Sequence, residues 1–216
     1  MAEFASLDSF VKVCGVTSSV DAQLVIDAGA TALGLIFAES RRQLTIESAR
    51  EIAQYAQGVI LVVGVFRDND ATFILEVVDH VALDAVQIHG PLDREVLIEL
   101  RRRGVGIIKA LSINEPDFTD FDENLVDAVL VDGPSPGSGA SHSWDTLATR
   151  SFSVPVIVAG GLNVATVAGV IELTNAWGVD VASAVETSPG VKGRELVMDF
   201  VSATRRHYSQ REERSD

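Results

Sequence analysis

The chain has 216 residues, of which 47% are hydrophobic, so it can bury a substantial core and is not a disordered polypeptide. Thirty-one acidic residues against seventeen basic ones give a formal net charge of −14, which argues against nucleic acid or an anionic membrane as a partner because both need a basic face. The chain has a single cysteine, and its first ten residues contain two acids and no base. No apolar run approaches the ~20 residues of a membrane span. These features predict a cytoplasmic protein.

Two kinds of segment alternate along the chain. Short runs rich in β-branched residues predict strands at residues 11–16, 32–37, 61–66, 85–90, 106–111, 128–133, 155–160 and 179–185. Longer segments with helical spacing lie between them, among them residues 21–30, 46–57, 71–81, 94–104 and 164–174. Gly29 and Gly104 are typical of helix ends, and Asn163 of a helix start. Near-continuous apolar strands indicate a parallel sheet that is covered by helices on its outer face.

This regular alternation predicts a single-domain (β/α)8 TIM barrel. The competing fold is an open doubly wound sheet, which usually has fewer strands and, in dinucleotide-binding proteins, a GxGxxG motif after the first strand. Residues 14–17 read CGVT and lack that motif. No linker divides the chain, so we expect one barrel domain over residues 11–207, an N-terminal extension at 1–10 and a frayed polar tail at 208–216.

In such a barrel the active site lies at the C-terminal ends of the strands. Asp132 ends an apolar run there, where a carboxylate is costly to bury unless it is paired or catalytic. Cys14 ends the first strand, although a lone cysteine is more often an inert buried side chain. Alternation along a strand puts Cys14 on the face of Lys12 and Gln87 on the face of His89. Cys14 and Asp132 could therefore face one cavity.

Glycines after the seventh predicted strand suggest a phosphate site. Gly160 and Gly161 precede a predicted helix, and Ser183 and Ala184 follow the next strand; the loops after these two strands commonly bind phosphate in barrels. A simple turn is the alternative interpretation. The glycine-rich segment 133–143 is also expected to be functional because loops of that length are uncommon in compact domains. No metal site is expected, since the four histidines and one cysteine lack ligand spacing.

Several motifs in order along the chain resemble the phosphoribosylanthranilate isomerase family: KVCGVT (12–17), SRR (40–42), VGVF (63–66), VQIHG (86–90), AGGLN (159–163) and DVASAVE (180–186). The resemblance implies a (β/α)8 barrel of tryptophan biosynthesis that works without a cofactor, as a monomer or homodimer. It implies an Amadori rearrangement of N-(5-phosphoribosyl)anthranilate to 1-(2-carboxyphenylamino)-1-deoxyribulose 5-phosphate, so the expected partner is a small phosphosugar.

The resemblance also implies roles for individual residues. Asp132 would be the general acid and Cys14 the general base, with Lys12 favouring the thiolate and Gly15 leaving room beside the sulfur. Arg42 would bind the anthranilate carboxylate. The remaining expected substrate contacts are the phosphate-binding Gly160, Gly161, Ser183 and Ala184, and the pocket-lining Gln87 and His89.

Some positions depart from the family pattern. Ala184 stands where a glycine is usual, the loop residues 136–144 lack the usual lysine, and Gly193 replaces an acid. These departures leave open an alternative, a paralogue that binds a phosphosugar without turnover or acts on an altered substrate. An additional role in histidine biosynthesis is not expected, because residues 66–68 and 89–91 lack a second glycine pair for a second phosphate.

Overall fold

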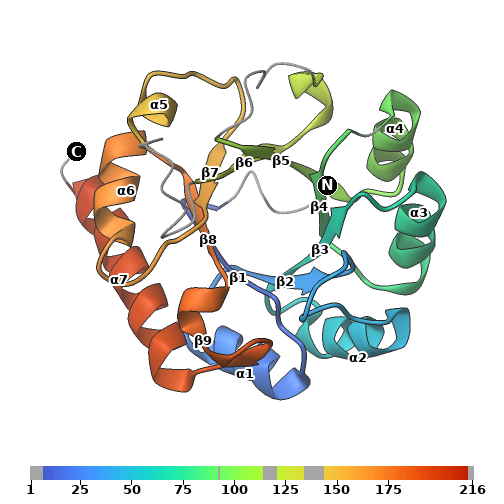
Figure 1. Ribbon diagram of the computed structural model, residues 1–216, viewed down its shortest axis with the longest axis horizontal. Coiled ribbons are helices and arrows are strands. Elements are labelled where there is room, and N and C mark those ends of the chain that lie inside the picture. Colours follow the sequence, from blue (N-terminus) through green and yellow to red (C-terminus); the bar gives the residue numbers. More distant parts are fainter. Residues whose placement is uncertain (1–6, 92, 114–120, 134–143, 214–216) are drawn as a thin grey trace.

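The protein is a closed eight-stranded parallel barrel, as the alternation of segments predicts (Figure 1). The computed structural model describes residues 7–91, 93–113, 121–133 and 144–213. Each strand pairs with the next along the chain, and the last pairs with the first. The barrel strands are β1 (Phe10–Cys14), β2 (Ala32–Ile36), β3 (Leu61–Arg67), β4 (Ala85–His89), β5 (Gly106–Ser112), β6 (Ala128–Asp132), β7 (Val156–Ala159) and β8 (Gly178–Val181).

Helices surround the barrel on its outer side (Figure 1). They are α1 (Ser19–Asp27), α2 (Ile46–Ala56), α3 (Ala71–His80), α4 (Arg94–Arg102), α5 (Asp145–Ala148), α6 (Val167–Thr174) and α7 (Arg194–Glu213), with the short 3-10 helices η2 (Glu123–Leu125) and η3 (Ser183–Val185). A hairpin of β9 (Glu186–Ser188) and β10 (Val191–Lys192) lies between η3 and α7. In the described part of the chain, no helix combines the length and the apolar composition that a membrane crossing requires.

Local sequence explains where several helices begin and end. The side chains of Ser18, Thr45 and Asp70 each accept a hydrogen bond from a backbone N–H in the first turn of α1, α2 and α3. Gly29 and Gly104 follow α1 and α4 with φ of 79° and 75°, as predicted for helix ends. The predicted start at Asn163 is early: its Oδ1 accepts from Ala165 and Thr166 in a turn, and α6 begins at Val167.

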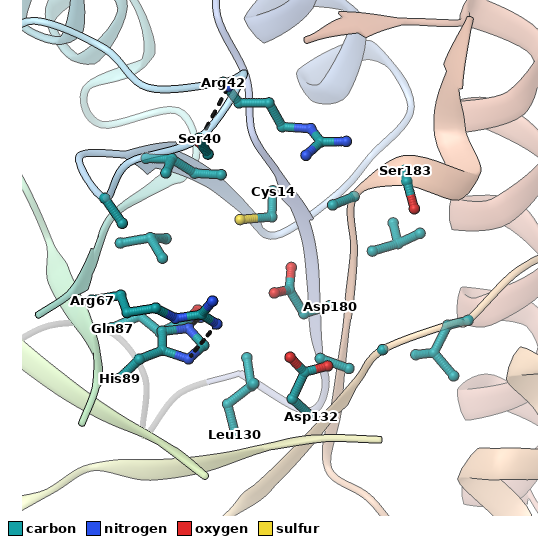
Figure 2. A pocket seen from close by; sticks show the side chains of 18 of the residues that line it. Cys14, Ser40, Arg42, Arg67, Gln87, His89, Leu130, Asp132, Asp180 and Ser183 are labelled. Atoms are coloured by element: carbon teal, nitrogen blue, oxygen red, sulfur yellow. Dashed lines mark hydrogen bonds between the residues drawn. The ribbon is translucent and has the colours of Figure 1, made fainter. Parts of the chain in front are cut away.

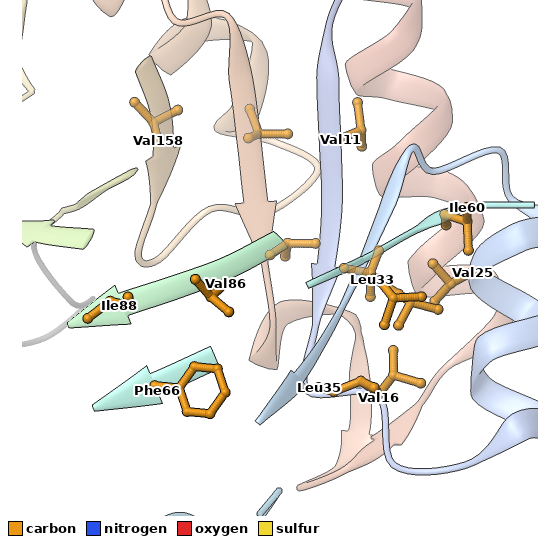
Figure 3. Close-up of a cluster of buried hydrophobic side chains, with 14 of the residues drawn as sticks. Val11, Val16, Val25, Leu33, Leu35, Ile60, Phe66, Val86, Ile88 and Val158 are labelled. Carbon is orange, nitrogen blue, oxygen red and sulfur yellow. The ribbon is translucent and has the colours of Figure 1, made fainter. Parts of the chain in front are cut away.

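Two apolar layers follow from the alternation of side chains along each strand. Leu61 and Val63 of β3 lie inside the barrel with Ile108 and Leu130, whereas Val62 and Phe66 belong to the layer between the barrel and the helices. Figure 3 shows part of this outer layer, which includes strand side chains such as Leu33 and Val86 and helix side chains such as Val25 of α1. Both layers are filled by side chains, so the barrel is a packed core.

The N-terminal end of the barrel is closed by aromatic packing. Trp177 stacks on Phe10 with ring centroids 5.3 Å apart, and its Nε1 donates to the carbonyl oxygen of Leu7 at 3.2 Å. The barrel strand β1 begins at Phe10, one residue before the expected boundary. With this end closed by apolar groups, inward-facing polar groups gather toward the other end.

The expected frayed tail from residue 208 is wrong for the residues that the structure describes, because α7 continues to Glu213. Its buried face carries Val197, Val201, Thr204 and Tyr208 at the three- and four-residue spacing of a helix stripe. Tyr208 is only 7% exposed, and its hydroxyl donates to the carbonyl oxygen of Ala176. The polar composition of residues 208–213 reflects the solvent face of this helix, and the single aromatic side chain supplies its packing.

Candidate active site

A cavity of about 320 Å³ opens at the C-terminal ends of the barrel strands (Figure 2). The structure brings all the residues that the sequence suggested for a site to its wall: Cys14, Arg42, Gln87, His89, Asp132, Gly160, Gly161, Ser183 and Ala184. Cys14 of β1 and Asp132 of β6 face the same cavity, as the alternation along their strands predicts. Of the predicted loop 133–143, only Gly133 belongs to the described residues.

Cys14 occupies a space that a glycine on the neighbouring strand leaves open. It pairs in register with Gly34 of β2, where an added Cβ would lie 2.8 Å from the sulfur. Gly15, with φ of 74°, accommodates Arg42, because a Cβ there would lie 2.5 Å from Arg42 Cδ. The pairing of β1 with β2 therefore places Gly34 beside the thiol.

A buried ion pair lies on the same inward face as Cys14. Lys12 Nζ is 2.7 Å from Asp180 Oδ2, and the other carboxylate oxygen of Asp180 has no hydrogen-bond partner among the described residues. Burial raises the pKa of Cys14 above its ordinary value; Lys12 and Lys192 oppose this shift and Asp180 adds to it. Lys12 thus favours the thiolate, as expected, but burial is the larger effect. Asp180 was not among the predicted site residues.

Asp132 sits at the end of β6 with its carboxyl group held close to a glycine. Burial raises the pKa of Asp132, with Asp180 contributing, while Arg67 and Lys12 oppose the shift, so the neutral acid is favoured relative to a solvated aspartate. A Cβ at Gly160 would lie 2.4 Å from Asp132 Oδ1, so Gly160 leaves room for this carboxyl group. The geometry suits a proton donor in a mostly enclosed place.

Arg42 is already bound to a carboxylate. Its Nε and one terminal nitrogen each donate to Glu186 at 2.7 Å, in the two-pronged arrangement typical of arginine and carboxylate. Lys192 Nζ donates to the same carboxylate at 2.9 Å and to the carbonyl oxygen of Cys14 at 2.6 Å. This cluster ties the loop after β2 and the β9–β10 hairpin to the end of β1. The sequence signal for Glu186 and Lys192 is only their place after the last barrel strand.

On the opposite wall, His89 lies between two polar side chains. Its Nε2 is 2.9 Å from Gln87 Nε2, and its Nδ1 is 3.3 Å from a terminal nitrogen of Arg67. Burial, followed by the charge of Arg67, lowers the pKa of His89 to about 4, so this imidazole is neutral near pH 7. Arg67 lines the cavity and was also missed. The sequence feature that could have indicated Arg67 is its place at the end of the third apolar strand, on the same face as Val63 and Val65.

The wall formed by the ends of β7 and β8 has the features expected of a phosphate site. Gly160 and Gly161 have φ of 84° and 67°, which favour glycine. Ser183 and Ala184 lie on the same wall in η3. Asp68 and Asn175 are the non-glycine residues with positive φ in the described ranges, so Ala184 keeps an ordinary backbone conformation. The alanine therefore does not need the backbone freedom of a glycine.

Lys109 lies on the alternate face of β5, donates to the carbonyl oxygen of Gly90 at 2.6 Å, and does not line the cavity. Within the described ranges, no group of three or more histidine, cysteine, aspartate or glutamate side chains is placed to hold a metal ion.

Fold and cavity together define a (β/α)8 barrel whose mouth gathers a thiol, a buried carboxyl group, arginines and a glycine pair, a set suited to acid–base chemistry on an anionic ligand. The chain belongs to the N-(5'-phosphoribosyl)anthranilate (PRA) isomerase family, whose model matches residues 11–203.

Individual relatives agree with this assignment along nearly the whole chain. The N-(5'-phosphoribosyl)anthranilate isomerase of Oceanobacillus iheyensis is 36% identical over 202 residues, which cover 91% of this chain and 97% of that protein. That of Rubrobacter xylanophilus is 37% identical, with 90% and 98% covered. The crystal structure of the phosphoribosyl anthranilate isomerase from Thermotoga maritima superposes with a TM-score of 0.80 at 30% identity, covering 91% of this chain and 98% of that one.

A further solved relative carries a ligand. It is a phosphoribosyl anthranilate isomerase in complex with reduced 1-(o-carboxyphenylamino)-1-deoxyribulose 5-phosphate, with a TM-score of 0.77 and 29% identity, covering 91% of this chain and 98% of that one.

Proposed function

We propose that this chain is an N-(5'-phosphoribosyl)anthranilate isomerase of tryptophan biosynthesis, which carries out the Amadori rearrangement of its substrate to 1-(2-carboxyphenylamino)-1-deoxyribulose 5-phosphate. The observation that carries this proposal is the placement of Cys14 and Asp132 in one cavity at the mouth of a barrel of this family. The relative with the reduced product analogue supports the ligand class, a small phosphosugar bearing an aromatic carboxylate.

The rearrangement needs a proton donor and a proton acceptor. In the proposed mechanism neutral Asp132 gives its proton to the ring oxygen, the bond from C1 to that oxygen breaks, and the nitrogen lone pair forms an iminium ion. The Cys14 thiolate then removes the proton from C2, and the electron pair forms an enolamine. Uptake of a proton at C1 and loss of the hydroxyl proton at C2 give the ketone. No cofactor takes part in these steps.

The environments of the two groups fit these roles. The raised pKa of Asp132 keeps more of this group in the protonated form that a donor requires. The raised pKa of Cys14 makes the thiolate a minor form at neutral pH but a stronger base when it forms, and Lys12 and Lys192 limit the cost of its negative charge. A working thiol of this kind suits the reducing cytoplasm.

The two opposite walls of the cavity suggest which residues would contact each part of the substrate. The phosphate would lie against Gly160, Gly161, Ser183 and Ala184, where positive φ at the glycines allows close approach of the backbone. Gln87 and His89 would line the opposite wall as uncharged polar contacts. Arg42 would meet the anthranilate carboxylate through the N–H groups that Glu186 does not use.

The direct test follows anthranilate fluorescence after freshly formed phosphoribosylanthranilate is mixed with purified protein. We expect enzyme-dependent loss of substrate well above the spontaneous rate. A protein that binds the reduced product analogue but leaves the substrate signal unchanged would instead be the non-catalytic paralogue. The ordinary backbone of Ala184 removes one reason for that alternative.

A further inference from the structure

Arg67 is a cationic side chain that lines the cavity and forms no ion pair with a carboxylate of the described residues. It ends β3 on the inward face of Val63 and Val65, and it lines the same cavity as Cys14 and Asp132. Among the described residues, none of the ion pairs of the protein includes Arg67. Arg67 is exposed at the mouth of the cavity, so its charge is available to an anion that enters from outside.

The turn after β3 holds the start of this side chain in place. Asp68 has φ of 58°, a conformation that non-glycine residues adopt infrequently. The backbone N–H of Arg67 donates to Asn69 Oδ1 at 3.0 Å, which closes the turn. Arg67 thus leaves the end of the strand from a defined turn.

His89 orients the guanidinium without neutralising it. Arginine only donates hydrogen bonds, so the neutral His89 must accept at Nδ1 and carry its hydrogen on Nε2. That hydrogen points to Gln87, whose buried Oε1 otherwise has no partner among the described groups; rotation of the amide places this oxygen at the acceptor position. A chain from Gln87 through His89 to Arg67 therefore orients the guanidinium group and leaves its positive charge available.

The position of Arg67 matches the far end of an extended ligand. In the closed barrel, β3 lies four strands from β7, on the opposite side of the mouth from Gly160 and Gly161. Figure 2 shows Arg67 and His89 on one side of Cys14 and Ser183 on the other. A ligand whose phosphate lies at the β7–β8 wall and whose sugar passes Cys14 directs its aromatic end toward β3.

We propose that Arg67 binds the carboxylate of the anthranilate ring and is a specificity-determining residue for an aromatic amine with an ortho carboxyl group. This inference rests on the proposed function. A guanidinium group can donate two parallel hydrogen bonds to a carboxylate. In Arg42, the Nε and one terminal nitrogen already donate such a pair to Glu186. Arg42 and Arg67 would then approach the carboxylate from neighbouring strand ends, with Arg67 supplying the charge that has no internal partner.

The test compares two ligands and four proteins. The ligands are reduced 1-(2-carboxyphenylamino)-1-deoxyribulose 5-phosphate and the same compound without its carboxyl group. The proteins are the wild type, Arg67→Met, Arg67→Lys and the control Arg41→Met, which removes an equal charge from an exposed residue that does not line the cavity. Dissociation constants are measured by calorimetry, and turnover is measured with phosphoribosylanthranilate.

For Arg67→Met we expect about 10- to 100-fold weaker binding of the carboxylated ligand, with less than about 3-fold change for the ligand that lacks the carboxyl group. Arg67→Lys should lose part of this selectivity, because lysine keeps the positive charge but cannot donate two parallel hydrogen bonds to a carboxylate. Arg41→Met should bind both ligands as the wild type does. In turnover, Arg67→Met should raise KM more than it lowers kcat.

Two outcomes would overturn the inference alone: equal weakening of both ligands by Arg67→Met, or no weakening of either, in a protein whose wild type is active. Equal weakening would place Arg67 at another part of the ligand, such as the phosphate. A wild type that binds neither ligand and does not turn over the substrate would overturn the proposed function itself, and the inference with it.

Discussion

At the scale of single residues, Cys14 and Asp132 carry the proposed chemistry. Cys14→Ser and Asp132→Asn each preserve side-chain shape and remove one proton-transfer group, so we expect kcat to fall by about 10²- to 10⁴-fold in either variant. Binding of the reduced product analogue should stay within a few fold of the wild type. Stopped-flow fluorescence measures the first quantity and calorimetry the second. A near-normal kcat in one variant would remove that residue from its role.

Gly160 is another residue of the cavity at which a larger side chain would not fit. Gly160→Ala would place a methyl group 2.4 Å from Asp132 Oδ1 and 2.8 Å from the backbone of Gly133, at a φ of 84°. We expect displacement of Asp132 and at least a ten-fold loss of kcat, together with a loss of about 1–2 kcal/mol in the free energy of unfolding.

Gly58→Ala is the matched control for this substitution. Gly58 has φ of 74°, but an added Cβ there meets nothing within 4 Å. It should show the same backbone cost in urea unfolding and an unchanged kcat. If both variants keep full activity, Asp132 does not need the space at Gly160.

At the scale of the element, α7 stabilises the barrel through its last turns as well as its first. Tyr208→Ala removes a buried ring and its hydrogen bond to Ala176, so we expect a loss of about 3–4 kcal/mol in the free energy of unfolding. Tyr208→Phe should cost only about 1 kcal/mol. The exposed neighbour Ser209→Ala should be nearly neutral, and urea denaturation measures all three. A small effect of Tyr208→Ala would mean that the chain after residue 207 behaves as the tail expected from its composition.

At the scale of the whole molecule, stability depends on pH through His89. Its pKa is lowered in the folded protein to about 4 from an unfolded value of 6.5, so the unfolded state binds more protons between these values. The stabilisation that neutral His89 permits is fully present above pH 6.5 and is lost as the pH falls toward 4. Between pH 7 and 5 this group should cost about 1–2 kcal/mol, allowing for its partial exposure.

The measurement is urea unfolding of the wild type and His89→Asn from pH 5 to pH 8. Because asparagine does not titrate, the difference in unfolding free energy between the two proteins isolates the histidine. The wild type should lose stability relative to the variant as the pH falls. A difference that does not vary with pH would mean that His89 titrates alike in the folded and unfolded states.

Much of this protein follows from local patterns in its sequence. Period-two alternation in runs such as residues 85–89 and 128–132 determines which side chains face inward, and regular spacing of these runs leads to the barrel. Because the C-terminal ends of parallel strands meet at one mouth, Cys14, His89 and Asp132 could be placed together from the sequence. These features depend on near neighbours in the chain and on one general rule of the fold.

Only the tertiary structure decided the contacts between residues far apart in the chain. Closure of β8 onto β1 puts Asp180 against Lys12, and the hairpin after β8 brings Glu186 to Arg42. Pairing of β1 with β2 puts Gly34 beside the sulfur, which no local pattern indicates. Such contacts depend on strand register and barrel closure, and these are set by the packing of the whole chain, so periodicity within one segment cannot specify them.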